Sequence, residues 1–150
     1  MGMPFKSFMA AVYIVHEEGV LLLFDAAREE WLPPSGAIEE HELPEEAAVR
    51  IVRQQLHADI EIIGERRLVG ERLLLSEPIA MLVQRDVRHE LVELCFAAAL
   101  RTAVHEDVHW IDARWFSDED LNSEPIPASV RLCAERARSR RLSHDQGSAV

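Results

Sequence analysis

The sequence predicts an α+β domain in which helices flank a mixed β-sheet. Its 150 residues suffice for one compact domain with its own core. Apolar runs of strand length outnumber segments with helical periodicity, and they come before, between and after the helices. No internal repeat or low-complexity linker divides the chain. We therefore expect a single domain over residues 1–142 and a frayed tail over residues 143–150.

The expected strands start with a hairpin. The β-rich run 8–15 and the apolar run 20–24 are joined by the turn signal Glu18-Gly19. The segment 31–38 contains the sequence Pro-Pro-Ser-Gly at 33–36, which predicts an extended segment that bends at the glycine. Further strands are expected at 60–63, 67–75, 79–85, 91–100 and 113–116.

Three helices are expected among these strands. Pro44 suits the first position of a helix that ends near His57, and Glu45 and Glu46 fall in its first turn, where the helix dipole favours anions. Apolar residues at 48, 52 and 56 give this helix one buried face. Ser117, followed by acidic residues, predicts a capped short helix, and residues 126–138 predict a last amphipathic helix.

The composition limits the class of partner and the compartment. The formal net charge of −11 repels phosphate backbones, so we expect no nucleic acid partner. The apolar run 8–15 is too short for a membrane helix of roughly 20 residues, and no small-residue cleavage site follows it. Cys95 and Cys133 are isolated among apolar neighbours, which favours two buried free thiols. These features predict a cytoplasmic protein without a membrane partner.

A longer motif lies in the middle of the chain. Residues 31–60 read WLPPSGAIEEHELPEEAAVRIVRQQLHADI. This segment resembles the Nudix box of the MutT-like hydrolase superfamily, G-x5-E-x7-R-E-U-x-E-E-x-G-U, in which U is apolar. Gly36, Glu42 and Arg50 match the frame in identity and spacing. Segments near 77–80, 89–96 and 114–117 are similar to later Nudix strands, so the resemblance covers most of the chain.

The resemblance implies a fold, a cofactor and a substrate class. The fold would be the Nudix fold, a mixed sheet sandwiched between helices. The cofactor would be Mg²⁺ or Mn²⁺, and the substrate would be a nucleoside diphosphate linked to another group. Function still depends on the site, because one fold hosts many activities.

The box departs from the family pattern at the metal ligands. Ile51, Gln54 and Gln55 stand where the family has three glutamates, so the Nudix box is degenerate. These positions lie within about 100° of helical arc, so carboxylates there would converge on one divalent cation. Each carboxylate would add roughly 2 kcal/mol after desolvation, about thirty-fold in metal affinity. Glutamine offers only a neutral amide oxygen, and isoleucine offers no ligand.

The remaining acidic residues supply weaker candidates. Glu42, Arg50 and Glu93 are the candidate catalytic residues. Glu42 could orient Arg50 or help to bind a metal, although a structural ion pair between loop and helix is the favoured alternative. Glu42 and Glu46 are the possible substitute metal ligands, and Glu45 and Glu46 are otherwise expected to be solvated. Glu93 could act as a base, with a surface role as its alternative.

Other residues are candidates for ligand or zinc binding. Gly36, Arg53 and Arg85 are the candidate binding residues, and Arg28 and Arg88 are further possible phosphate contacts. His105 and His109, with Glu106, match the H-E-x-x-H signature of zinc proteases. A polar loop is favoured there, because a strand follows directly and no third ligand stands at a suitable spacing.

The sequence thus predicts a Nudix-fold protein that binds a nucleotide or a nucleoside-diphosphate-type phosphorylated metabolite, with pyrophosphate hydrolysis absent or weak. A working Mg²⁺- or Mn²⁺-dependent pyrophosphohydrolase with substitute carboxylates is the first alternative. A zinc hydrolase and an interaction module without a small ligand are the others. The expected partner is a small phosphorylated ligand, and a homodimer is compatible with so many strands in a small domain.

Overall fold

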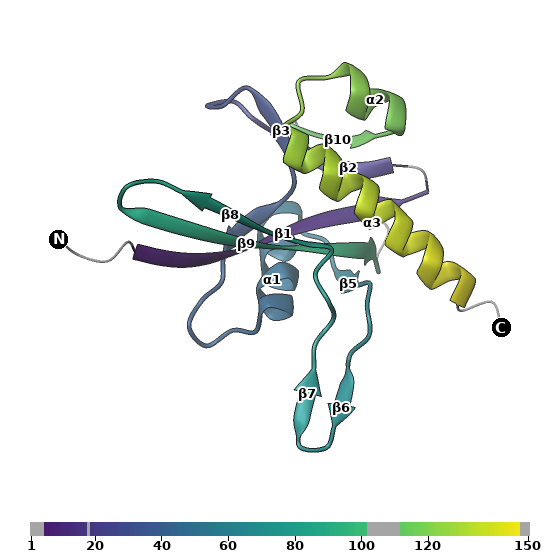
Figure 1. Ribbon diagram of the computed structural model, residues 1–150. Coiled ribbons are helices and arrows are strands. Elements are labelled where there is room, and N and C mark those ends of the chain that lie inside the picture. Colours follow the sequence, from purple (N-terminus) through teal and green to yellow (C-terminus); the bar gives the residue numbers. More distant parts are fainter. Residues whose placement is uncertain (1–4, 18, 102–111, 148–150) are drawn as a thin grey trace.

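The computed structural model describes residues 5–17, 19–101 and 112–147, and it confirms the α+β prediction. A mixed eight-stranded sheet forms the centre of the molecule (Figure 1). Helix α1 (Pro44–Leu56) packs on one face of the sheet and helix α3 (Ala128–Gly147) on the other. The short helix α2 (Asp118–Ser123) follows the strand at one edge.

The central strands of this sheet are parallel. The strands are β1 (Phe5–His16), β2 (Gly19–Asp25), β3 (Glu30–Leu32), β4 (Ser35–Ala37), β5 (Ile60–Ile62), β8 (Ala80–Arg85), β9 (His89–Leu100) and β10 (Ala113–Phe116). β1 and β9 pair from Phe5 opposite His89 to Ile14 opposite Ala98. Both are long apolar runs, as expected of strands that are covered on both faces. β2 and β10 extend the sheet beyond β1, while β5 and β8 both pair with β9.

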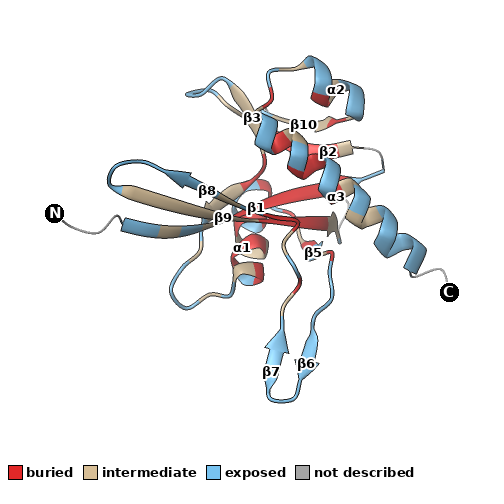
Figure 2. Ribbon diagram, in the orientation of Figure 1, coloured by how far each residue is buried: buried red, intermediate tan, exposed pale blue. Residues whose placement is uncertain are grey.

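Two cores lie on opposite faces of the sheet because side chains alternate along each strand. On β1, Ala10, Val12 and Ile14 pack toward α1, whereas Ala11 and Tyr13 pack toward α3. Figure 2 shows the buried residues concentrated on these central strands and on the inner faces of the two helices. The sheet therefore separates the environment of α1 from that of α3.

The boundaries of α1 confirm the prediction. Pro44 is its first residue, and the backbone N–H of Leu43 donates to Glu46 Oε1 at 2.9 Å. The helix ends at Leu56, and His57 takes the left-handed conformation with φ of 52°, donating its N–H to the carbonyl of Arg53. Such a left-handed residue is a common helix terminator.

The prediction of one strand over residues 67–75 was wrong. These residues form a separate two-stranded hairpin, β6 (Arg67–Val69) and β7 (Arg72–Leu74). Gly70 reverses the chain with φ of 63°, a conformation that glycine adopts without steric cost.

The last helix was also predicted too short, and the expected frayed tail was misplaced. α3 begins at Ala128 and continues to Gly147, so residues 143–147 are helical, whereas residues 148–150 lie outside the described part of the chain. Arginines fasten its second half to the body. Arg140 donates to the carbonyl of Glu77, and Arg141 donates to the carbonyl of Val15 at 3.0 Å.

Cys95 and Cys133 are buried free thiols, as predicted. Within residues 5–17, 19–101 and 112–147, no helix is long and apolar enough to cross a membrane.

Candidate functional site

The Nudix-like segment is organised around β4. This strand lies antiparallel to β1, with Gly36 opposite Ala10 and Ser35 opposite Ala11. A Cβ on Gly36 would lie 3.2 Å from Ile51 Cγ1, which is closer than a normal carbon contact. The glycine predicted to bind a ligand therefore lets α1 approach the strand closely, which is a packing role.

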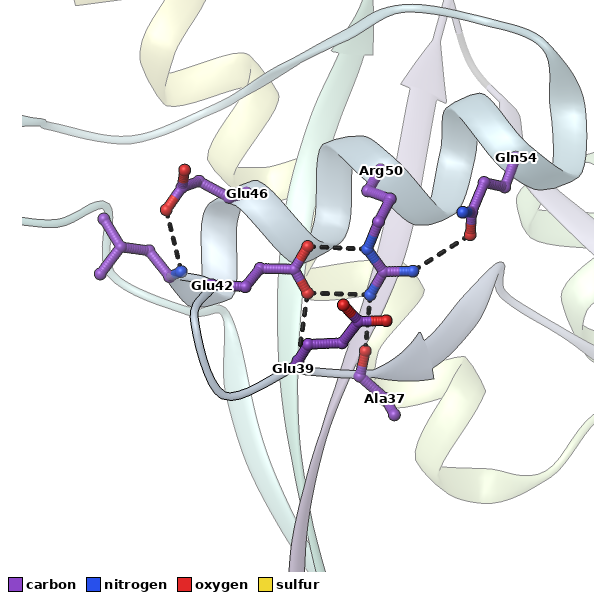
Figure 3. Close-up of polar contacts among 7 residues, drawn as sticks. Ala37, Glu39, Glu42, Glu46, Arg50 and Gln54 are labelled. Carbon is purple, nitrogen blue, oxygen red and sulfur yellow. Dashed lines mark hydrogen bonds and ion pairs between the residues drawn. The ribbon is translucent and has the colours of Figure 1, made fainter.

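Arg50 joins three parts of this segment (Figure 3). Its Nε donates to Glu42 Oε2 at 2.7 Å, and its Nη2 donates to Glu42 Oε1 at 2.8 Å. Nη2 also donates to the carbonyl of Ala37 at 2.8 Å, and Nη1 donates to Gln54 Oε1 at 3.0 Å. One guanidinium thus fixes the end of β4, the following loop and the middle of α1 relative to one another.

The pair of Glu42 and Arg50 is partly shielded from water. The Glu42 side chain is only 14% exposed and the Arg50 side chain 28%. The hydrogen bonds from Arg50 hold the pKa of Glu42 below its usual value, and Glu42 in turn raises the pKa of Arg50. This is the ion pair between loop and helix that the spacing predicts, and it leaves Glu42 ionised and occupied.

The three family metal positions do not fit a divalent cation. Ile51 is buried in the core, while Gln54 and Gln55 are exposed. Gln54 accepts from Arg50, and Gln55 Nε2 donates to the carbonyl oxygen of Ser35 at 2.9 Å. The amide N–H group of Gln55 therefore occupies the side of this helix face where a cation would need an oxygen ligand. Mg²⁺ and Mn²⁺ prefer charged oxygen ligands, and this helix face supplies none.

The possible substitute carboxylates already have donors. Glu46 Oε1 accepts from the N–H of Leu43. Glu45, expected to be solvated, is instead only 5% exposed; it accepts from the N–H of Ser76, and its Oε2 lies 3.6 Å from Arg66 Nη1. In the described part of the chain, no three His, Cys, Asp or Glu residues gather in a way that could hold a metal ion.

A cavity of about 470 Å³ lies on the opposite face of β4 from α1. It meets the Nudix-like segment at Ser35, which also accepts the bond from Gln55. Apolar walls come from Met9, Leu32 and Leu82, and from Val130 in the first turn of α3. Its volume lies within the range typical of small-molecule sites.

Three charged residues line this cavity, namely Asp25, Arg28 and Glu93. Asp25 caps its own turn, because its Oδ1 accepts from the backbone N–H groups of Ala27 and Arg28. Glu93 lies on β9 beside Met9 and Leu82, where it is half-buried; its Oε1 receives only a weak contact at 3.5 Å from Cys95 Sγ. Arg28 lies at the β2–β3 turn, and no described side chain accepts a hydrogen bond from its guanidinium. The cavity therefore offers a cation to an anionic group and a carboxylate to a hydrogen-bond donor.

The structure separates several residues that the sequence grouped together. Glu93 forms no hydrogen bond or ion pair with Glu42 or Arg50, and it faces α3 rather than α1. Arg53 pairs with Asp59 at 2.8 Å, and Arg85 pairs with Glu90 at 2.9 Å; neither arginine lines the cavity. The H-E-x-x-H segment, His105 to His109, lies outside the described residues.

Sequence reasoning missed part of the cavity lining. Gln84 on β8 and Ser129 on α3 contribute polar groups, and neither belongs to a recognisable motif. Gln84 shares a face with Glu93 by strand alternation because it lies opposite Leu91, a register that only the structure shows. Ser129 is brought to the cavity by the packing of α3, which the sequence does not show either.

Solved Nudix structures match this chain over most of its length. A hydrolase of the NUDIX family from Clostridium perfringens matches with a TM-score of 0.72 at 23% identity, over 89% of this chain and 97% of that one. The MutT protein from Methanosarcina mazei Go1 matches with a TM-score of 0.66 at 17% identity, over 94% and 99% of the two chains. The C. elegans Ap4A hydrolase matches with a TM-score of 0.62 at 17% identity, over 91% and 98%. No family model and no curated protein matches the sequence. The chain therefore has the Nudix fold that its box predicts, and at these identities the likeness concerns the fold alone.

Proposed function

We propose that this Nudix-fold protein binds a nucleotide or a related phosphorylated metabolite in the cavity beside Glu93, and that it hydrolyses this ligand weakly or not at all. The observation that carries the proposal is the bond from Gln55 to the carbonyl of Ser35. On one side of Ser35 a neutral amide closes the position of the family metal site. On the other side of Ser35 lies the ligand-sized cavity.

The chemistry of the cavity indicates the kind of ligand. Arg28 would bind a phosphate, because a guanidinium presents several donors to phosphate oxygens. Glu93 would accept hydrogen bonds from an amino group or ring N–H of a base. Leu32, Leu82 and Val130 would cover the apolar faces of that base. A ligand with a phosphate at one end and an amino-bearing ring at the other would meet Arg28 and Glu93 at the same time.

Binding should not require a metal. We expect a panel of nucleoside di- and triphosphates and nucleotide sugars to include ligands whose calorimetric affinity is the same in EDTA and in millimolar Mg²⁺. We expect no phosphate release from them in Mg²⁺ or Mn²⁺. Arg28→Ala and Glu93→Gln should each weaken binding by about ten-fold or more, as expected for a lost hydrogen bond to a charged group. Arg85 lies outside the cavity, so Arg85→Ala is the matched control.

Robust turnover that depends on Mg²⁺ or Mn²⁺ would instead support the alternative, a pyrophosphohydrolase with substitute carboxylates. Stoichiometric zinc in the purified protein that is lost in His105→Ala would support the zinc hydrolase. Binding that survives both cavity substitutions would place the ligand elsewhere on the molecule.

A restored metal site offers a second test. The triple variant Ile51→Glu, Gln54→Glu, Gln55→Glu should bind Mn²⁺, and Mn²⁺ should raise its Tm but leave that of the unmodified protein unchanged. The variant will be less stable without metal, because it buries a carboxylate at position 51 against Gly36. Ile51→Gln adds a polar group of similar size without charge, and its Tm should not respond to Mn²⁺.

A further inference from the structure

The carboxylate of Glu93 lies in the wall of the cavity with most of its hydrogen-bonding capacity unused. Glu93 is half-buried on β9, between Met9 on β1 and Leu82 on β8. Its Oε1 receives the weak contact from Cys95 Sγ at 3.5 Å, and no other group in the described part of the chain donates to the carboxylate. A carboxylate away from bulk water needs donors for its lone pairs. Both oxygens of Glu93 are therefore available to two donors of a bound molecule.

A second polar group lies on the same face of the sheet. Gln84 is opposite Leu91 on the β8–β9 pair, which makes it a diagonal neighbour of Glu93. Diagonal neighbours lie about 7–8 Å apart, within reach of long side chains. The Gln84 amide also lines the cavity, and it forms no hydrogen bond with any described residue. The two side chains together offer a pair of acceptors with an amide donor beside them.

The other charged groups of the cavity lie at the β2–β3 turn. Asp25 is the second carboxylate, but its Oδ1 already accepts from the backbone N–H groups of Ala27 and Arg28. The Arg28 guanidinium is the cation that suits a phosphate. Among the charged groups of the cavity, Glu93 is thus the acceptor that is best placed to distinguish one ring from another.

The nucleobases differ in the donors and acceptors along their edges. Guanine presents a ring N–H and an amino group side by side, followed by a carbonyl oxygen. Adenine and cytosine present an amino group beside an unprotonated ring nitrogen, so the second oxygen of a carboxylate would face a lone pair. The ring N–H of uracil lies between two carbonyl oxygens, which a carboxylate repels. Two adjacent acceptors with a donor beside them therefore match guanine.

We propose that Glu93 and Gln84 select guanine, so that the ligand of this cavity is a guanine nucleotide with its phosphates at Arg28. Glu93 would accept from the ring N–H and the 2-amino group, and Gln84 would donate to the carbonyl oxygen. The inference rests on the proposed function, because it names the base of the ligand that the function requires. Two hydrogen bonds to a charged acceptor should favour GDP over ADP by at least about thirty-fold.

Calorimetric titration of the full chain in EDTA tests this selection. GDP, IDP and ADP carry the same phosphates and ribose, so differences in affinity among them report the base alone. IDP keeps the ring N–H and the carbonyl oxygen but lacks the 2-amino group. We expect it to bind about ten-fold more weakly than GDP, and ADP to bind more weakly still.

Glu93→Gln should change the preference rather than merely weaken binding. A glutamine presents one acceptor and one donor, the arrangement that matches the amino group and ring nitrogen of adenine. The variant should bind GDP about ten-fold or more weakly, and it should bind ADP at least as tightly as the unmodified protein does. A purely structural role of Glu93 would weaken both nucleotides alike. Glu90→Gln is the matched control, because Glu90 lies on the same strand but outside the cavity and pairs with Arg85. It should leave both affinities unchanged.

Arg28→Ala separates this inference from the proposed function. Because Arg28 would contact phosphate, its loss should weaken GDP and ADP by the same factor. Nucleotides that bind without preference for guanine and still depend on Arg28 would overturn the guanine assignment and leave the proposed function standing. A guanine preference that survives Glu93→Gln would overturn the role of Glu93. If no nucleotide binds at all, both proposals are wrong.

Discussion

Arg50 shows at the scale of single residues how the degenerate box still organises this protein. Its guanidinium donates to the Glu42 carboxylate through two nitrogens and also reaches the carbonyl of Ala37. A lysine at this position could not reproduce this geometry, since its ammonium is a single point charge. The frame of the box is therefore maintained by structural hydrogen bonds, whether or not the chain hydrolyses anything.

The free energy of unfolding should report this role. We expect Arg50→Lys to lose about 1.5–3 kcal/mol, the usual cost of losing hydrogen bonds to a charged group. Urea denaturation measures the loss. Gln54→Ala removes only one exposed partner of Arg50 and should cost much less. Equal losses in the two variants would show that the Glu42 contact is not the important one.

The same pair predicts a pH dependence. Because Arg50 lowers the pKa of Glu42 in the folded state, the pair stabilises the protein above the ordinary glutamate pKa of 4.5, and this contribution is lost as pH falls through the folded-state value. Asp86, Glu90 and Asp120 also have lowered pKa values, so the whole protein should weaken in acid. The difference in unfolding free energy between the unmodified protein and Glu42→Gln isolates one group, and it should shrink as pH falls from 6 to 3. A constant difference would contradict the assignment.

At the scale of elements, the hairpin of β6 and β7 (residues 65–74, called the arm) is attached to the body by the start of α1. The buried Glu45 accepts from the N–H of Ser76, which follows β7, and also lies near Arg66, which precedes β6. Gly64 and Ser76 meet at the base of the arm, and a Cβ on Gly64 would lie only 2.7 Å from the Cβ of Ser76. The two ends of the arm are thus held together by one carboxylate and one close backbone approach.

Gly64→Ala should therefore loosen the base of the arm. Forcing the two side chains apart should cost about 1–3 kcal/mol in unfolding free energy, as overpacking usually does. The double variant Gly64→Ala, Ser76→Gly removes the opposing Cβ and should recover most of this loss. A double variant as unstable as the single one would show that the clash is not the cause.

At the scale of the whole molecule, the sheet and α3 together bury two thiols and a phenol. Cys95 on β9 and Cys133 on α3 are completely buried, and Tyr13 on β1 is nearly so. Burial raises the pKa of Tyr13, and the hydrogen bond with Cys133 together with burial raises that of Cys95, whereas the same hydrogen bond lowers the pKa of Cys133. Burial of both thiols therefore decides their reactivity. A thiol must be accessible and ionised before it reacts.

The two thiols should therefore report opening of the α3 face. In native buffer near pH 8 we expect no reaction with Ellman's reagent, and in denaturing urea we expect two thiols per chain to react. If one thiol reacted rapidly in the native protein, α3 would not cover the sheet as described.

The linear pattern alone predicted much of this protein. Period-two and helical repeats act over neighbouring residues, so they placed most strands and both ends of α1 within a residue or two. The spacing of Gly36, Glu42 and Arg50 pointed to the fold, and the identity of residues 51, 54 and 55 showed which face lacks negative charge. Each of these features lies within one short stretch of chain.

Long-range contacts decided the rest. Glu45 is buried because Ser76, 31 residues later, folds over it, and Gln55 closes on Ser35 from 20 residues away. The register of β9 against β1 and β8 sets Glu93 beside the apolar wall of the cavity and on the face away from Arg50. Whether a carboxylate is solvated, paired or left at the edge of a cavity depends on which distant segment covers it, and only the packed sheet determines that neighbour.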